Sequence, residues 1–270
     1  MTLVWRPGFQ FDADASTYIE AVEAADTQAL ETGVRYAIND FVIGCKNDGI
    51  WNAIKASCIL AGARTLSGAL VPLAGTAPTN YNFVAGDYNR ETGLVGDGST
   101  KYLNSNRNNN ADPQDNAHIS AYGTQWGPTT TTVKAVIGRQ VNGFNERALA
   151  VATNLNSGNL SSRVQSQDSW ASHGKPRATG FIGASRSNSS NIEVRNNKIT
   201  VLANQSSFTP SVFSLFVFAS SNGVSPNNAG NPAAYDNSRL SFYSIGESLD
   251  LAALDTRVSN LITAIGAAIP

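Results

Sequence analysis

Two histidines, a small set of acids and four tryptophans are the residues of this chain best suited to chemistry or ligand recognition. His118 and His173 do not stand among cysteines or acids at metal-ligand spacing, so the sequence predicts no zinc site. A Gly-x-Ser-x-Gly turn, which presents the nucleophilic serine of many hydrolases, is absent from the sequence. The glycine-rich stretch 93–98 is not followed by the Lys-Ser pair and helix that bind phosphate, and we expect an ordinary turn there.

Glycoside cleavage would require two carboxyl groups facing each other across the scissile bond, about 5 to 9.5 Å apart. The acids after residue 63 that could serve are Asp87, Glu91, Asp97, Asp112, Asp115, Glu146, Asp168, Glu193, Asp236 and Glu247. None of them forms the Glu-x-Asp-x-x-Glu strand signature of sandwich glucanases. We therefore expect a protein that is not an enzyme, with polysaccharide degradation as the alternative.

Clustered oxygen ligands occur in the segment 106–110 together with Asp112 and Asp115, which raises calcium as a candidate. Their spacing matches no calcium-binding loop, whereas Asn and Asp commonly close turns with their own side chains. The prediction is no metal and no cofactor, with Ca²⁺ as the alternative.

Aromatic rings beside neutral polar groups are suited to sugars, which offer an apolar ring face and many hydroxyls. Trp126, Trp170, Tyr122 and Tyr235 lie in or next to polar segments and are the predicted glycan-binding residues. Trp170 leads this set because 167–169 is Gln-Asp-Ser. The alternative for each ring is that it folds inward as a loop anchor.

The N-terminal sixty residues carry apolar side chains at helical spacing, and this pattern predicts helices at 14–25, 27–43 and 49–60. We treat 1–62 as a helical segment for attachment or oligomerisation. Its predicted contact residues are Trp5, Leu30, Val34, Phe41 and Trp51. Cys45 and Cys58 fall in this region, where buried reduced thiols are expected, although a disulfide between them stays open.

From residue 63 onward the pattern changes to short runs of β-formers separated by turns rich in Asn, Gly and Ser, typical of a β-sandwich. Predicted strands are 65–70, 101–104, 118–122, 131–137, 146–151, 161–165, 179–182, 191–194, 198–203, 212–219 and 240–244. A helix is predicted at 250–267, with Ser248 or Asp250 as its cap. The second domain is thus 63–270, a sandwich closed by a C-terminal helix.

One segment makes the sequence recognisable. Asp87-Tyr88-Asn89-Arg90, then 96–103 (Gly-Asp-Gly-Ser-Thr-Lys-Tyr-Leu) and 104–107 (Asn-Ser-Asn-Arg), resemble a family of tailed-phage and prophage virion proteins. The resemblance implies a concanavalin A-like (laminin-G-like) jelly-roll β-sandwich. It also implies a structural role on the particle surface, as a tail, baseplate or fibre component, or as a capsid decoration protein.

Composition fits such a role and limits the partners. Charged residues make up 14% of the chain and the net charge is −1, whereas nucleic-acid binders need a basic excess. No run approaches the roughly 18 apolar residues of a membrane span, and the N-terminus lacks a secretory signal. We expect assembly into virions in the bacterial cytoplasm, as a homotrimer in contact with other virion proteins and with host surface polysaccharide as a ligand.

Overall fold

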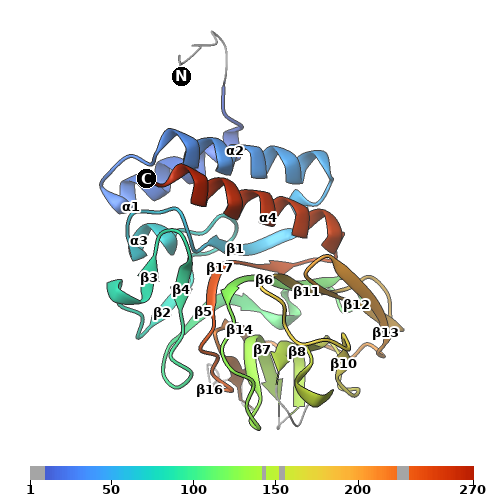
Figure 1. Cartoon of the computed structure of the whole chain (residues 1–270). Helices are drawn as coiled ribbons and strands as arrows, with labels where there is room; N and C mark the ends of the chain where they lie inside the picture. The colour runs from blue at the N-terminus through green and yellow to red at the C-terminus, as the bar shows by residue number, and fades with distance from the viewer. Residues whose placement is uncertain (1–9, 142–143, 152–155, 224–230) are drawn as a thin grey trace.

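A computed structural model describes residues 10–141, 144–151, 156–223 and 231–270. It shows a mainly β protein: two sheets pack face to face as a sandwich, and a layer of helices covers the outer face of one of them (Figure 1). Within the described ranges, no helix is long and apolar enough to cross a membrane.

The helical layer combines both ends of the described chain. It contains α1 (Ala13–Asp26), α2 (Thr32–Asn47) and α4 (Leu251–Ala268), and α4 lies alongside α2 (Figure 1). Asp12 caps α1 by accepting the Asp14 amide, and Asp250 caps α4 by accepting those of Ala252 and Ala253. The first, second and C-terminal predicted helices are thereby confirmed, with boundaries shifted by a few residues.

The third predicted helix, 49–60, is wrong. A short 3₁₀ turn η1 (Trp51–Ala53) leads into strand β1 (Ile54–Ile59), which pairs antiparallel with β17 (Arg239–Gly246). Ala56 and Cys58 face the opposite sheet while Ile54 and Ile59 face the helices. Burial on both faces removes the alternation that marks a strand, so the apolar residues matched a helical period instead.

The predicted strand 65–70 is also wrong, because this segment forms the short helix α3 (Leu66–Ala69). The Thr65 hydroxyl accepts the Gly68 amide at the start of that helix. A capping threonine was therefore mistaken for a β-branched strand residue.

Sheet A has the strand order β13-β12-β11-β6-β17-β4-β3, with β1 also paired to β17. Its strands are β13 (Ile199–Asn204), β12 (Asn191–Asn196), β11 (Gly180–Arg186), β6 (Ala117–Gln125), β4 (Gly93–Val95) and β3 (Tyr88–Asn89). A two-residue turn at Asn197 and Lys198, both at positive φ, joins β12 to β13.

Sheet B has the order β10-β9-β8-β7-β14-β5-β2. Its strands are β10 (Ala171–Ser172), β9 (Ser161–Val164), β8 (Phe144–Val151), β7 (Lys134–Val141), β14 (Ser214–Val217), β5 (Tyr102–Asn108) and β2 (Thr79–Tyr81). β15 (Ser220–Asn222) pairs parallel with β7 and antiparallel with β16 (Asn231–Ala233). Further 3₁₀ turns are η2 (Ala85–Asp87), η3 (Asn109–Ala111) and η4 (Asn156–Gly158).

Two large hydrophobic clusters hold these layers together. One lies between the sheets, and the other joins the helices to the outer face of sheet A. In the second cluster the ring of Phe41 from α2 meets the ring of Phe242 from β17 edge-on, at 5.8 Å. The helices and sandwich share this core, while the division of the chain at 62/63 stays a prediction.

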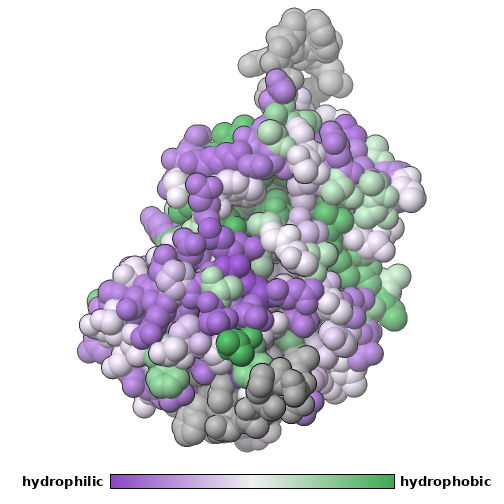
Figure 2. Space-filling view, turned by 180° about the vertical axis from the view of Figure 1, so that it is seen from behind, coloured by the Kyte–Doolittle hydropathy of each residue, from purple (hydrophilic) through white to green (hydrophobic). Residues whose placement is uncertain are grey.

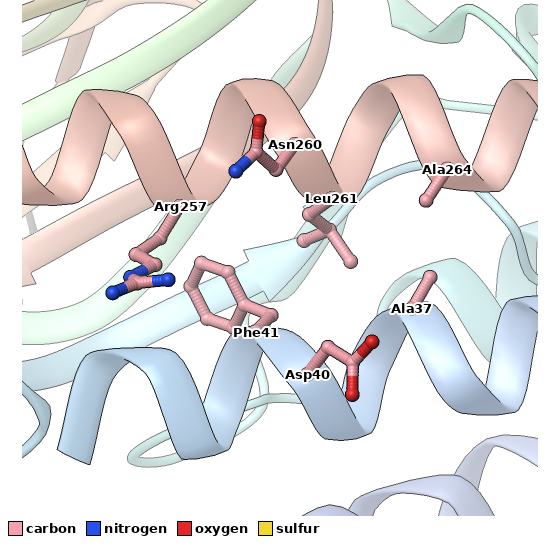
Figure 3. Close-up of a pocket in the computed structure, with 7 residues that line it drawn as sticks. All are labelled: Ala37, Asp40, Phe41, Arg257, Asn260, Leu261 and Ala264. Carbon is pink, nitrogen blue, oxygen red and sulfur yellow. The ribbon is translucent and has the colours of Figure 1, made fainter. Parts of the chain in front are cut away.

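Where α2 and α4 meet, a hollow of about 290 Å³ opens between them. Figure 3 shows Phe41 and Leu261 pointing toward each other across it, with Arg257 beside the ring. Arg257 forms a bidentate ion pair with Asp48 at 2.7 and 2.8 Å, which ties the end of α2 to α4.

Candidate functional site

Trp126 is a loop anchor. Its indole Nε1 donates to the Ala178 carbonyl at 2.7 Å, and the Arg177 guanidinium lies over the ring at 4.9 Å. The ring also lies on Gly123, where a Cβ would come within 2.3 Å of it. The half-buried ring is therefore in contact with the Ala178 carbonyl, the Arg177 guanidinium and the Gly123 backbone. These contacts occupy the parts of the ring that a sugar would bind.

Trp170 and Tyr122 are similarly engaged. The Arg163 guanidinium lies 4.9 Å from the centre of the half-buried Trp170 ring. Tyr122 packs on the core beneath the helices, and its hydroxyl hydrogen-bonds Ser259 of α4. Burial raises the pKa of Tyr122, which keeps the hydroxyl neutral.

Most of the predicted attachment residues are buried in the interior of the protein. Leu30, Val34 and Phe41 are buried in the core between the helices and sheet A, so they present no free surface. Trp51 is half-buried beside a hollow of about 370 Å³, with its Nε1 bonded to Asp14. Trp5 lies outside the described residues.

Tyr235 is the predicted aromatic residue that joins other rings at the surface. It meets Tyr102 edge-on, with ring centres 6.2 Å apart. Tyr102 in turn contacts Phe216 at 4.7 Å and stacks on Tyr81 at 4.4 Å, with the two tyrosine planes only 5° apart. We call these four residues the tyrosine surface. Tyr102 and Phe216 are its buried base, and Tyr81 and Tyr235 are its more exposed part.

Strand register builds this surface on the outer face of sheet B. Tyr81 of β2 lies directly opposite Tyr102 of β5, so the two rings project side by side. The next residue of β5, Leu103, points the other way into the core between the sheets. Tyr102 is only 8% exposed and serves as the base of the stack, whereas Tyr81 is 39% exposed and forms its outer layer.

Neutral polar side chains flank the stack along the same strands. Thr79 and Asn104 face each other across β2 and β5, two residues from Tyr81 and Tyr102. Asn106 donates to the Ala77 carbonyl at 2.8 Å and Asn82 to the Thr100 carbonyl at 2.8 Å. The Nδ2 of Asn106 also donates to the Thr79 hydroxyl at 3.0 Å, so these bonds fix both amides in place.

Charges near the tyrosine surface are held by local partners. Lys101 pairs with Asp87 at 2.5 Å. Partial burial acts to raise the pKa of Asp97, but hydrogen bonds from the Thr100 hydroxyl and from three backbone amides lower it overall. Asp97 thus remains an internal turn cap.

The hydroxyls of Tyr102 and Tyr235 are neutral over the ordinary pH range, because the pKa of each is raised. Burial, with help from the neighbouring Tyr81 and Tyr235, raises the pKa of Tyr102 to about 12. Burial and the charge of Asp97 raise the pKa of Tyr235. Each hydroxyl can donate and accept, which suits an uncharged polar ligand.

A hollow of about 390 Å³ contains two carboxylates, those of Glu193 and Asp250. Its other lining residues are Ser185, Ser187, Ser248 and Leu249. Asp250 already accepts two backbone amides as the cap of α4, at 2.7 and 3.1 Å. No group of three or more metal-ligating side chains occurs among the described residues. Asp112, one of the residues of the calcium alternative, is bound by Arg107 and Arg147.

Much of the remaining surface is polar. Figure 2 shows the side opposite to that of Figure 1, where hydrophilic side chains predominate over the sandwich and hydrophobic ones form smaller patches.

The sequence matches no protein-family model and no curated protein sequence. Solved structures similar to it include a leech intramolecular trans-sialidase complexed with 2,7-anhydro-Neu5Ac, at 11% identity and a TM-score of 0.37 over 58% of this chain and 24% of the enzyme. The binding domain of botulinum neurotoxin serotype D aligns at 10% identity and 0.48, over 77% of this chain and 50% of the domain. A Ruminococcus gnavus sialidase CBM40 bound to α2,6-sialyllactose aligns at 10% identity and a TM-score of 0.34, over 57% of this chain and 84% of the CBM40.

The chain spans 24% of the length of the leech enzyme and 50% of the length of the toxin domain. With TM-scores this low, the function proposed below rests on the chain's own residues.

Tyr81 and Tyr102 were missed from the sequence. Tyr102 belongs to a short apolar run that marks a strand, and Tyr81 lies in a polar stretch with few strand signals. Only the pairing of β2 with β5, across twenty intervening residues that include β3 and β4, brings the two rings together.

Proposed function

We propose that this chain is a non-enzymatic binding module that recognises a neutral polysaccharide through its tyrosine surface. The observation that carries the proposal is the Tyr81–Tyr102 stack: one face of Tyr81 lies on Tyr102, while 39% of the residue stays exposed at the edge of sheet B. A flat, exposed ring beside fixed amides is the arrangement that binds the apolar face of a hexose and its hydroxyls.

The stack also limits the entropy cost of binding. Tyr102 holds the Tyr81 ring in a single orientation, and Phe216 and Tyr235 hold Tyr102 in turn. A ring that is already ordered loses little freedom when a sugar packs against it. Because Lys101 and Asp97 are bound by their own neighbours, the surface favours an uncharged ligand.

The setting proposed for this activity is the surface of a tailed-phage particle, which the sequence resemblance supports. A tail, baseplate or fibre position would bring the tyrosine surface to the host polysaccharide, while capsid decoration is the alternative position. Immunogold labelling of purified particles with an antibody to this chain tests the setting. Gold on the tail would favour the first position, gold on the head the second, and unlabelled particles would contradict both.

Glycan binding is tested with the full chain on an array of neutral and acidic bacterial polysaccharides, followed by titration of the strongest ligand. Tyr81→Ala should weaken binding at least tenfold. Tyr36→Ala is the matched control, since Tyr36 is 42% exposed on α2, and it should bind as the unmodified chain does. An array without binding, or equal losses in both variants, would contradict the proposal.

A place for the enzymatic alternative is the hollow that contains Glu193 and Asp250. Release of reducing ends from the bound polysaccharide, abolished in Glu193→Gln, would establish it. Binding without such release supports the non-enzymatic module.

A further inference from the structure

We propose that two copies of this chain associate through strand β13, which pairs antiparallel with its own counterpart across a two-fold axis and joins the two A sheets. β13 stands at the end of sheet A, at the outer edge of the sandwich (Figure 1). Its six residues, Ile199–Asn204, have β12 on one side only.

The other sheet edges among the described residues are short or covered. β10, β2 and β3 are two or three residues long. β1 has six residues, but the segment 73–75 lies along it: the Leu73 amide donates to the Ser57 carbonyl at 2.8 Å, and the Ser57 amide to the Ala74 carbonyl at 3.1 Å. Short or covered edges are the usual protection against unwanted strand pairing, and β13 has neither.

The residue types of β13 also give it no protection against pairing with another strand. It contains no charge and no proline, the residues that normally keep an edge strand solitary. Two of its aliphatic side chains are among the most exposed large hydrophobics described, Leu202 at 66% and Ile199 at 57%. An uncharged edge strand with exposed aliphatic side chains is suited to pairing with a strand of another chain.

Hairpin geometry determines which backbone groups are available. Asn196 and Ile199 flank the two-residue turn, so Ile199, Val201 and Ala203 direct their amides and carbonyls toward β12. The amides and carbonyls of Thr200, Leu202 and Asn204 then point away from the sheet. Val201 and Ala203 pack against the inter-sheet core, and His173 Nε2 lies 3.1 Å from the Ile199 carbonyl, so the strand is held in place.

The outward groups complement a second copy of themselves. An antiparallel pair centred on Leu202 places Leu202 opposite its counterpart, and Thr200 opposite the partner's Asn204. Every outward amide and carbonyl of the three residues then meets a partner. The two Leu202 side chains lie side by side on one face, which removes part of their own exposed surface from water.

The experiment is sedimentation velocity of the full chain over a wide range of concentration. We expect a reversible monomer–dimer equilibrium, in place of the homotrimer predicted from the sequence. Leu202→Lys brings two like charges face to face and should give a monomer at concentrations where the unmodified chain is dimeric. Ile43→Lys, at a 37% exposed position on α2, is the matched control and should leave the dimer intact.

Hydrogen exchange of the unmodified chain gives a second measurement that does not depend on a variant's folding. The amides of Thr200, Leu202 and Asn204 should become protected as the concentration rises. A chain that stays monomeric, an assembly that Leu202→Lys leaves unchanged, or unprotected amides at these positions would overturn the proposal.

Discussion

Arg147 Nη1 of β8 lies 2.8 Å from Asp112 Oδ2, and both side chains are fully buried. The Nη2 of the same guanidinium donates to the carbonyls of His118 on β6 and Gly246 on β17. One buried arginine of sheet B is thus bonded directly to two strands of sheet A. Arg107 binds the other oxygen of Asp112 from the solvent side.

Asp112→Asn should destabilise the fold strongly, because it leaves Arg147 charged and unpaired in the interior. Breaking one partner of a buried pair typically costs about 3–5 kcal/mol. Urea unfolding followed by circular dichroism measures the loss. Glu247→Gln is the control, since its pair with Lys55 is more than a third exposed and should contribute far less. Equal losses in the two variants would refute a central role for the buried pair.

His118 should make stability depend on pH. Its Nδ1 lies 2.5 Å from the Glu247 carbonyl and must carry the proton, so Nε2 accepts the Ser244 hydroxyl at 2.8 Å. Burial lowers the pKa of His118 from 6.5 to about 4, and the nearby Arg147 adds to this effect.

Between these values the unfolded chain binds a proton that the folded chain does not, so stability falls as pH is lowered from 6.5 toward 4, by about 3 kcal/mol in all. Urea midpoints at several pH values should show this slope, and His118→Gln should flatten it. An unchanged slope in the variant would assign the effect to other groups.

Both cysteines should be unreactive in the native protein. Cys45 and Cys58 are free and fully buried, and burial raises the pKa of each thiol to about 12. Without reductant, a thiol-specific chromophore should label neither residue in buffer and both in urea. Failure to label in urea would reveal a disulfide, and rapid labelling in buffer would show that one thiol is accessible.

Trp126 and Tyr81 should separate stability from recognition. Trp126→Ala removes the indole under Arg177 and its bond to Ala178, and should cost about 2–4 kcal/mol while glycan affinity is retained. Tyr81→Ala should show the reverse: weaker glycan binding with a small change in unfolding free energy. If the folded Trp126→Ala variant lost affinity for the glycan, Trp126 would be part of the binding surface, as the sequence predicts.

Local patterns were sufficient for most of the fold. The stripe through Leu30, Val34 and Phe41 and the capped stripe that begins at Asp250 predicted α2 and α4 because each helix buries a single face. Short runs of β-formers between turns rich in Asn, Gly and Ser predicted β6, β12 and β13. β1 was mistaken for a helix because both of its faces are buried, which leaves no two-residue period to detect.

The candidate site was harder to predict because it depends on long-range pairing. Trp126 and Trp170 stood in polar sequence, yet Arg177 and Arg163 cover them, and neither contact follows from local spacing. Tyr81 and Tyr102 acquire a shared surface only when β2 pairs with β5. Tyr235 was predicted as a glycan-binding residue, but the rings that it contacts could not be named from the sequence.

The packing of α4 against α2 has a consequence for the order of events during synthesis. The apolar face of α2 is translated some two hundred residues before Leu254, Val258 and Leu261, which cover it. Until the ribosome has released the last helix, that face has no native cover, and closing so long a loop is slow. The helical layer therefore forms only once α4 has left the ribosome, after every strand of the described sandwich has been made. Until then the apolar face of α2 is a surface for chaperones that bind exposed apolar segments.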